Sequence, residues 1–229
     1  MQSLYAVVAG IVKPLVSLCC RRDFRGLERI PQHGGLILAA NHVSVADPFV
    51  IALFVHEAGR QPRFMAKASL FRLPLAGWML RGLGQIPVHR YSADAKLSLN
   101  AAADAVRDGE IVVIYPEGTT THDPDYWPMQ ARTGVARLAI ETGATVVPVG
   151  QWGAQEFLGR RGRLRPFPRK TLHVRAGEPV ALQHWRGAKM DAHTLRECTD
   201  EIMAQITGLV AEIRDQPAPG AADQARRTA

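Results

Sequence analysis

The sequence has few cysteines, and they are not arranged as a metal site or a disulfide framework. Only three occur in 229 residues: Cys19 and Cys20 are neighbours, and Cys198 stands alone. There is no C-x-x-C pair, no zinc-ligand spacing and no even-numbered set of the kind found in small secreted domains. We therefore expect no metal site, and a reducing cytosolic environment is favoured.

Several familiar catalytic and nucleotide-binding motifs are also absent. The chain contains no GxSxG elbow, no GxxxxGK[ST] phosphate loop, no GxGxxG opening a helix and no HExxH. Serine hydrolases of the α/β type, P-loop NTPases, dinucleotide-binding folds and zinc peptidases are therefore not indicated.

The sequence also lacks a clean membrane-spanning segment. Residues 4–20 are nearly all apolar, but Lys13-Pro14 interrupts them, and they are fewer than the roughly 20 residues that a helix needs to cross a bilayer. No basic stretch precedes them, as a cleaved signal peptide would require. We expect residues 1–23 to form a membrane-associating helical segment at the bilayer surface, with a core-packing helix as the alternative.

Acidic residues are missing from one strongly basic stretch. The formal net charge is +7, and residues 160–170, RRGRLRPFPRK, hold six basic residues and no acidic one. Such a patch could face an anionic membrane, the phosphates of nucleic acid or only solvent. Pro166 and Pro168 exclude one continuous recognition helix.

What is present is an alternation of short apolar runs with longer helical patterns, and it predicts an α/β fold. We expect one domain, residues 24–214, with a mixed, largely parallel sheet covered by helices. The tail, residues 215–229, is rich in proline and alanine and is predicted to be disordered. The predicted strands are 36–40, 63–66, 85–88, 111–115, 145–149 and 171–174. The predicted helices are 48–58, 70–83, 93–107, 131–142 and a C-terminal helix opened by a Thr194–Glu197 capping box.

A histidine and an aspartate follow the first of these strands, in the segment NHVSVADP. On a continuous helix His42 and Asp47 would point about 140° apart, so the segment must turn. Asp47 before Pro48 is a good helix N-cap, which leaves His42 in the preceding loop. If the loop folds His42 back onto Asp47, the pair forms a general base with its orienting carboxylate. The alternative is a helix cap beside an ordinary polar loop residue.

A second polar cluster, Tyr115-Pro116-Glu117-Gly118-Thr119-Thr120, follows the predicted strand 111–115. Ligands of open α/β sheets bind at the carboxyl ends of strands. Backbone N–H groups, a carboxylate and two hydroxyls could hold a polyol or a developing oxyanion there. An ordinary turn is the alternative.

Together the two clusters resemble the glycerophospholipid acyltransferases, the family that includes 1-acyl-glycerol-3-phosphate (lysophosphatidate) acyltransferase. NHVSVAD is similar to the H-x4-D signature of the family, and YPEGTT is similar to its FPEGT-type block. Residues 64–90 and 145–153 resemble its second and fourth blocks, so the resemblance extends from about residue 24 to 180. The order and spacing of four blocks make the resemblance specific.

The resemblance implies a role for each matching residue. His42 would be the base and Asp47 its orienting partner, while Glu117, Gly118 and Thr119 belong to a block that positions the acceptor or polarises the thioester. Lys67 and Arg90 match basic positions associated with the phosphate of the acceptor. Where the family often has arginine, this chain has Thr120, and Arg132 could supply the missing cation.

The implied reaction moves a fatty acyl group from acyl-CoA or acyl-carrier protein to the free hydroxyl of 1-acyl-glycerol 3-phosphate, giving phosphatidate. A thioester is already activated, so we expect no cofactor, and the donor is a co-substrate. The partners would be a lysophospholipid acceptor and an anionic membrane surface, with the protein peripheral or monotopic on the cytoplasmic face of the cell membrane. Glycerol 3-phosphate or another lysolipid is an alternative acceptor. A non-catalytic lipid-binding module is a second alternative, and a nucleic-acid binder a third, although recognition motifs for nucleic acid are missing.

Overall fold

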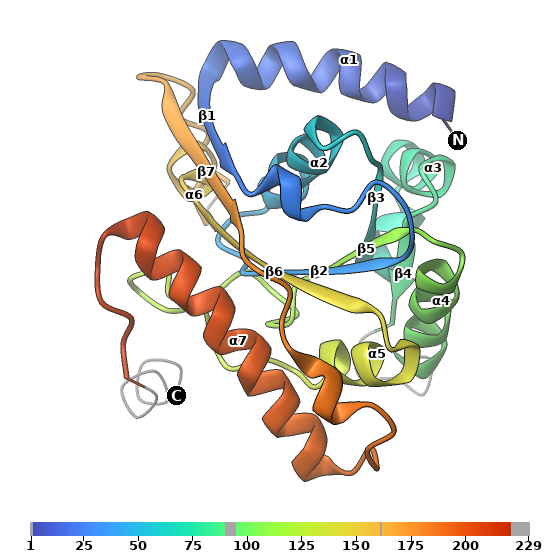
Figure 1. The fold of residues 1–229 in the computed structure, drawn as a ribbon. Coiled ribbons are helices and arrows are strands. Elements are labelled where there is room, and N and C mark those ends of the chain that lie inside the picture. Colours follow the sequence, from blue (N-terminus) through green and yellow to red (C-terminus); the bar gives the residue numbers. More distant parts are fainter. Residues whose placement is uncertain (1, 90–94, 161, 221–229) are drawn as a thin grey trace.

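A seven-stranded mixed sheet forms the middle of the molecule (Figure 1). The structure is a computed structural model that describes residues 2–89, 95–160 and 162–220. Along the sheet the strands follow the order β1-β7-β6-β2-β5-β3-β4, and neighbouring strands are parallel except for the antiparallel pair β6 and β7. The strands are β1 (Cys20–Arg25), β2 (Leu36–Ala40), β3 (Pro62–Lys67), β4 (Ile86–Val88), β5 (Ile111–Ile114), β6 (Thr145–Trp152) and β7 (Lys170–Ala176).

Helices cover both faces of the sheet, which confirms the predicted α/β class. In Figure 1, α1 and α2 lie above the sheet, and α5 and α7 lie below it. The α-helices are α1 (Gln2–Cys19), α2 (Asp47–Glu57), α3 (Pro74–Gly82), α4 (Ala95–Arg107), α5 (Gly134–Thr142), α6 (Ala154–Phe157) and α7 (Ala192–Arg214). Short 3-10 turns occupy η1 (Leu27–Arg29), η2 (Ala68–Arg72) and η3 (Leu182–Trp185).

The central strands β2 and β5 are apolar at every position because both of their faces are buried. In β2, Leu36, Leu38 and Ala40 pack with α2 on one face, whereas Ile37 and Ala39 pack with α4, α5 and α7 on the other. All five residues have no exposed surface. This two-sided burial fixes the position of the loops that leave the strand ends.

Three details differ from the sequence expectations. The predicted helix 70–83 is divided, because Leu73 before Pro74 is extended and η2 ends there. The capping box of Thr194 and Glu197 is wrong: Asp191 is the N-cap of α7, and its carboxylate accepts from the Thr194 N–H at 2.9 Å. Strand β1 was not predicted. It begins at Cys20, inside the N-terminal segment that we expected to extend to residue 23.

Helix α1 lies across one face of the molecule, and Pro14 is inside it. The Tyr5 hydroxyl donates to the carbonyl of Ala52 in α2 at 3.2 Å, while Val7, Ile11 and Leu18 remain exposed. Within the described residues, no helix combines the length and the apolar character needed to cross a membrane. The predicted disordered tail falls partly outside the described residues, and Gln216–Gly220 contains no helix or strand.

Candidate active site

The two polar clusters of the sequence meet at one edge of the sheet. Strands β2 and β5 are parallel neighbours, so the loops that follow them leave from the same side. The Thr121 N–H donates to the His42 carbonyl at 2.7 Å and joins the two loops directly. The fold therefore brings these two distant segments together.

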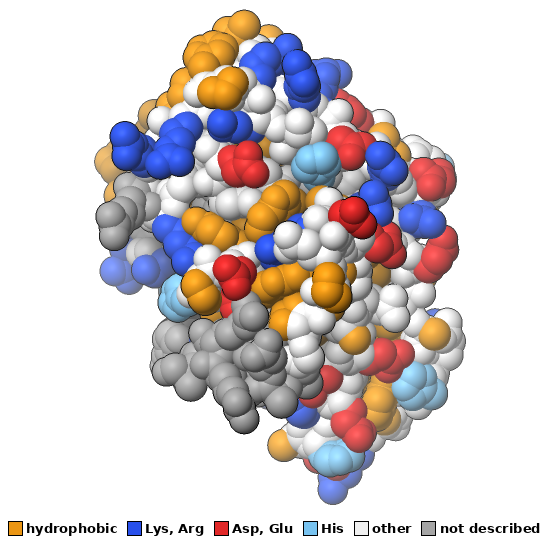
Figure 2. Space-filling view, turned by 90° about the vertical axis from the view of Figure 1, so that its left-hand side faces the viewer, with side chains coloured by type: hydrophobic (Ala, Val, Ile, Leu, Met, Phe, Trp, Pro, Cys, Tyr) orange, Lys and Arg blue, Asp and Glu red, His pale blue; other side chains and the backbone are white. Residues whose placement is uncertain are grey.

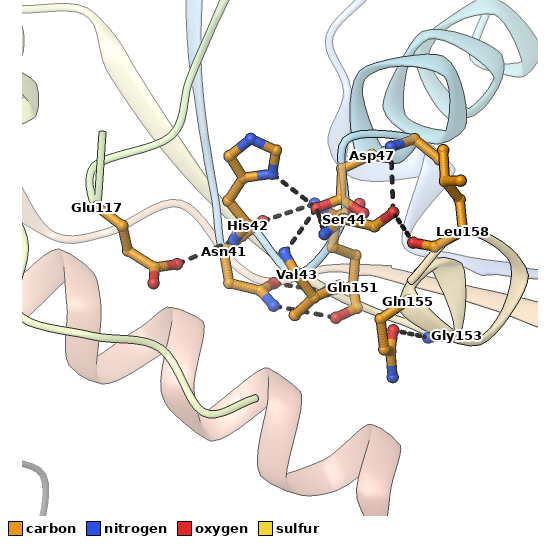
Figure 3. A network of polar contacts seen from close by, with 11 residues as sticks. Asn41, His42, Val43, Ser44, Asp47, Glu117, Gln151, Gly153, Gln155 and Leu158 are labelled. Carbon is orange, nitrogen blue, oxygen red and sulfur yellow. Dashed lines mark hydrogen bonds and ion pairs between the residues drawn. The ribbon is translucent and has the colours of Figure 1, made fainter. Parts of the chain in front are cut away.

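His42 and Asp47 form a pair, which is one of the two alternatives that the spacing left open and the one that the family resemblance implies (Figure 3). The His42 Nδ1 lies 2.8 Å from Asp47 Oδ2, and Figure 3 shows the other ring nitrogen pointing away from the carboxylate. The Asp47 side chain is fully buried, whereas 15% of the His42 side chain is exposed. A carboxylate on Nδ1 favours the tautomer that leaves Nε2 free to accept a proton. The pair therefore has the geometry of a general base with its orienting partner.

The prediction that Asp47 is the N-cap of a helix is wrong. Ala46 is the N-cap of α2, and the Asp47 side chain caps no helical N–H. Its Oδ2 instead accepts from the backbone N–H groups of Val43 and Ser44, at 2.7 and 2.8 Å. These bonds hold the loop in a turn around the carboxylate, and this turn brings His42 next to Asp47. Burial raises the Asp47 pKa, while the bond to His42 and the two backbone donors oppose that rise.

Glu117 ties the second loop to the first. Its Oε1 accepts from the His42 N–H at 2.9 Å and its Oε2 accepts from the Met129 N–H at 3.0 Å. The residue is 4% exposed, and burial raises the pKa of its carboxyl group to about 8. The structure thus places Glu117 behind His42, where it fixes the backbone of the base.

Because its pKa is raised on folding, Glu117 should make the protein less stable as pH rises. Between the ordinary carboxyl value and about 8, the folded state holds a proton that the unfolded state has lost. We expect the free energy of unfolding to fall across that window, and the fall to be smaller in Glu117→Gln. Urea titrations of both proteins from pH 5 to pH 9 measure the two slopes. Equal slopes would contradict the raised pKa.

Two polar residues that sequence reasoning missed clamp the strand ends. The side chain of Asn41 donates to the Gln151 carbonyl at 3.0 Å and accepts from the Gln151 N–H at 2.8 Å. The Gln151 side chain donates to the Asn41 carbonyl at 2.6 Å. Both residues are buried, so these bonds hold β2 and β6 together beside the base. Their only sequence signal was that Asn41 lies in the first and Gln151 in the fourth block of the family resemblance.

His42 opens into a cavity of about 540 Å³. Its walls are mainly apolar and come from helices α1 to α5 and from strands β3, β4 and β5, with Val8, Phe49, Met79 and Leu83 among the lining residues. Met79 and Leu83 thus line the cavity, whereas Leu75 and Trp78 of the same helix are exposed. An apolar cavity that ends at a general base suits a substrate with a long alkyl chain.

The predicted basic and loop residues divide into three groups. Lys67 at the end of β3 and Arg132 both line the cavity with His42, and so does Gly118. Gly118 has φ +73°, and a Cβ there would lie 3.0 Å from the Arg132 Nε, so glycine leaves room for that side chain. Among the described residues, Thr119 and Glu117 do not line the cavity. Arg90 lies outside the described residues.

Ser44 is not placed as a nucleophile. Its hydroxyl donates to the Leu158 carbonyl at 2.7 Å and accepts from the Ala46 N–H at 3.1 Å. The residue is 2% exposed. Its function in this geometry is to hold the loop that carries His42 against the segment after α6.

Comparisons with known proteins agree with this geometry. The model of the acyltransferase family matches residues 21–152. A chloroplast 1-acyl-sn-glycerol-3-phosphate acyltransferase of Brassica napus is 26% identical over 140 residues, which are 60% of this chain and 39% of that protein. A lyso-ornithine lipid O-acyltransferase of Pseudomonas aeruginosa is 29% identical over 163 residues, 65% of this chain and 60% of that protein. The chain thus spans less than two thirds of the length of these relatives.

A solved structure shares the fold. The crystal structure of the 1-acyl-sn-glycerophosphate acyltransferase from Thermotoga maritima superimposes with a TM-score of 0.65 at 21% identity, covering 91% of this chain and 82% of that one. The family match extends from β1 to the end of β6 and includes both loops of the site. It covers more than half of the sequence, and the chain therefore belongs to the acyltransferase family.

Proposed function

We propose that the protein is an O-acyltransferase that moves a fatty acyl group from a thioester donor, acyl-CoA or acyl-carrier protein, to the free hydroxyl of 1-acyl-glycerol 3-phosphate. The product would be phosphatidate, a precursor of phospholipids. The observation that carries the proposal is the His42–Asp47 pair at an apolar cavity that Lys67 and Arg132 also line. The family membership and the named activities of the relatives support it.

The geometry supports direct transfer in one addition and one elimination. As the acceptor oxygen attacks the thioester carbonyl carbon, His42 Nε2 takes the hydroxyl proton, and Asp47 stabilises the imidazolium that forms. The tetrahedral intermediate then releases the thiolate, which takes the proton from His42. The thioester supplies the activation, so the step consumes no ATP. Because the Ser44 hydroxyl is buried and bonded to Leu158, an acyl-serine intermediate is disfavoured.

The cavity wall explains how one site could hold the long chains of both substrates. Each methylene moved from water into an apolar wall contributes about 0.8 kcal/mol. Residues from α1 and α2 line the cavity, and three of its apolar lining residues, Val45, Phe49 and Leu70, are also exposed at the surface. A lipid could therefore enter from a bilayer without crossing bulk water.

Lys67 and Arg132 are the described cations that line the cavity, and we assign them to the acceptor headgroup. A phosphate dianion between a lysine and an arginine would form charge-assisted hydrogen bonds. The Arg132 N–H donates to the Pro116 carbonyl at 2.9 Å, which fixes the backbone position of this side chain. Arg132 would thus supply the positive charge that is missing at position 120, where this chain has threonine.

A second acceptor has a specific observation in its favour. The Pseudomonas aeruginosa relative acts on a lyso-ornithine lipid, whose ornithine headgroup carries no phosphate. Thr120 stands where the acyltransferase family that the sequence resembles often has arginine. A lyso-ornithine lipid is therefore the alternative acceptor for the same base and the same cavity.

Steady-state kinetics with each acceptor should distinguish lysophosphatidate from lyso-ornithine lipid. We expect Lys67→Ala and Arg132→Ala each to raise the KM for lysophosphatidate by about 10-fold and the donor KM by less than about 2-fold, because a lost charge-assisted bond weakens ground-state binding. Lys96→Ala, which removes an exposed lysine of α4 outside the cavity, is the matched control. Parental preference for lyso-ornithine lipid over lysophosphatidate, or an unchanged KM in both variants, would overturn the phosphate assignment.

We further propose that the protein attaches peripherally to the cytoplasmic face of the cell membrane through α1 and the basic stretch 160–170. Arg169 donates to the Ser17 and Cys20 carbonyls at 2.5 and 2.9 Å, so this stretch adjoins the end of α1. Leu164 and Phe167 are exposed there. Figure 2 shows hydrophobic side chains gathered where α1 lies, with Lys and Arg side chains beside them. The three free cysteines suit a reducing compartment.

Vesicle sedimentation should detect this surface. We expect Val7→Asp with Ile11→Asp to lower binding to phosphatidylglycerol-containing vesicles by about 10-fold or more, because charges replace two exposed apolar contacts. Leu97→Asp, a similarly exposed leucine on α4, is the control and should bind like the parent. Salt should weaken the remaining binding by screening the basic stretch. Parental binding by the double variant would exclude α1 as the contact.

A further inference from the structure

The imidazole of His42 is held on one flat face as well as at one nitrogen. The ring of Tyr115 lies parallel to it, with centroids 4.2 Å apart and an angle of 19° between the planes. Tyr115 is the first residue after β5, and His42 is the second residue after β2. The parallel pairing of these strands brings the two rings together.

One hydrogen bond does not by itself fix a ring. The torsions χ1 and χ2 of His42 can change together while the bond from Nδ1 to Asp47 is kept, and Nε2 would then sweep through the cavity. A parallel aromatic face removes that rotation, because tilting either ring separates the stacked surfaces. Stacking thus adds the orientation that the carboxylate leaves open.

The far end of the tyrosine is buried as well. Its hydroxyl lies near the Asp47 carboxylate and the Gln151 amide, but it has no hydrogen-bond partner among the described residues. Burial and the Asp47 charge raise the pKa of this phenol well above its usual value, so it stays neutral. Gln151 is itself clamped to Asn41, as described above. Packing against the core and stacking on His42, and not a hydrogen bond of the hydroxyl, therefore hold the tyrosine ring.

We propose that Tyr115 is a positioning residue of the base: its ring stacks on the His42 imidazole and fixes the ring plane in which Nδ1 meets Asp47 and Nε2 faces the cavity. The inference rests on the proposed acyl transfer for its kinetic consequence. Its structural content, one fixed orientation and one tautomer of His42, does not depend on the substrate. The hydroxyl is secondary, because the stacking face belongs to the ring.

The test compares Tyr115→Leu with Tyr115→Phe. Leucine keeps an apolar side chain but removes the flat face, and we expect kcat to fall by about 10- to 100-fold with each KM within about 2-fold, since misplacing a base costs rate and not binding. Phenylalanine restores the face, and its kcat should lie within about 3-fold of the parental value. Phe24→Leu is the control for a general loss of aromatic packing. It removes the half-buried ring of Phe24 in β1, which packs edge-on against Phe54 of α2 away from His42.

Nuclear magnetic resonance of ¹⁵N-labelled histidine supplies a readout without substrate. The parent and Tyr115→Phe should show His42 as one Nδ1–H tautomer, whereas Tyr115→Leu should show exchange between two. A leucine variant with parental kcat and one tautomer would overturn the proposal, as would a phenylalanine variant as impaired as the leucine variant. If the parent transfers no acyl group to any lipid, the proposed function fails, while the tautomer difference would still establish the positioning role.

Discussion

Replacing His42 with alanine is expected to lower acyl transfer by about 10³-fold or more, the range that loss of a positioned general base produces. His42 is the cavity-lining residue whose Nδ1 meets a buried carboxylate. Without it, the acceptor hydroxyl would have to lose its proton to water. The KM values for donor and acceptor should change little, because the imidazole acts on a proton that moves only in the transition state.

The chain offers a matched control for this experiment. His173 in β7 also meets an aspartate, with Nδ1 3.0 Å from Asp23 Oδ2, but it does not line the cavity at His42. His173→Ala should therefore keep kcat within about 3-fold of the parent, since exposed pairs contribute little. Equal losses in the two variants would mean that the effect of His42→Ala is structural.

Replacing Asp47 with asparagine should cost almost as much, about 10³-fold in kcat, although the fold remains intact. The single oxygen of the asparagine amide can still accept from Val43 and Ser44, because both bonds go to one atom, Oδ2. The amide cannot stabilise an imidazolium, so the loss isolates the negative charge. Since burial already disfavours that charge, its removal should leave the melting temperature unchanged or higher.

Steady-state kinetics and a melting curve on the same preparation check this prediction, and Asp23→Asn is the control with the same chemistry. A parental kcat in Asp47→Asn would show that the carboxylate only folds the loop. A low kcat with a collapsed melting temperature would contradict the claim that the charge and the fold are separable.

The layered fold could be read from the sequence because buried strands are apolar at every position. Segments such as 36–40 and 146–149 have no polar residue that would permit another environment, and the structure confirms both as parts of strands. Strand β1 could not be read in this way, since its sequence CRRDFR has neither an apolar run nor a clean alternation. It is a strand because β7 pairs with it.

The site was predictable where spacing along the chain constrains it, and unpredictable where it depends on contacts between loops. The separation of His42 and Asp47 required a turn, and the structure contains it. Glu117 behind the backbone of His42, and Tyr115 on its ring, are contacts between segments more than seventy residues apart. Local spacing carries no information about such contacts, so their sequence signal was limited to membership of a motif.

The central claim is that this site transfers an acyl group to a lipid hydroxyl, and the most direct measurement follows both products together. Purified protein is incubated with acyl-CoA, with and without lysophosphatidate or lyso-ornithine lipid, while free thiol is titrated and lipid products are identified by mass. The account predicts thiol release that requires an acceptor, equals the diacylated lipid formed and disappears in His42→Ala. Acceptor-independent thiol release, or equal rates in the parent and His42→Ala, would contradict it.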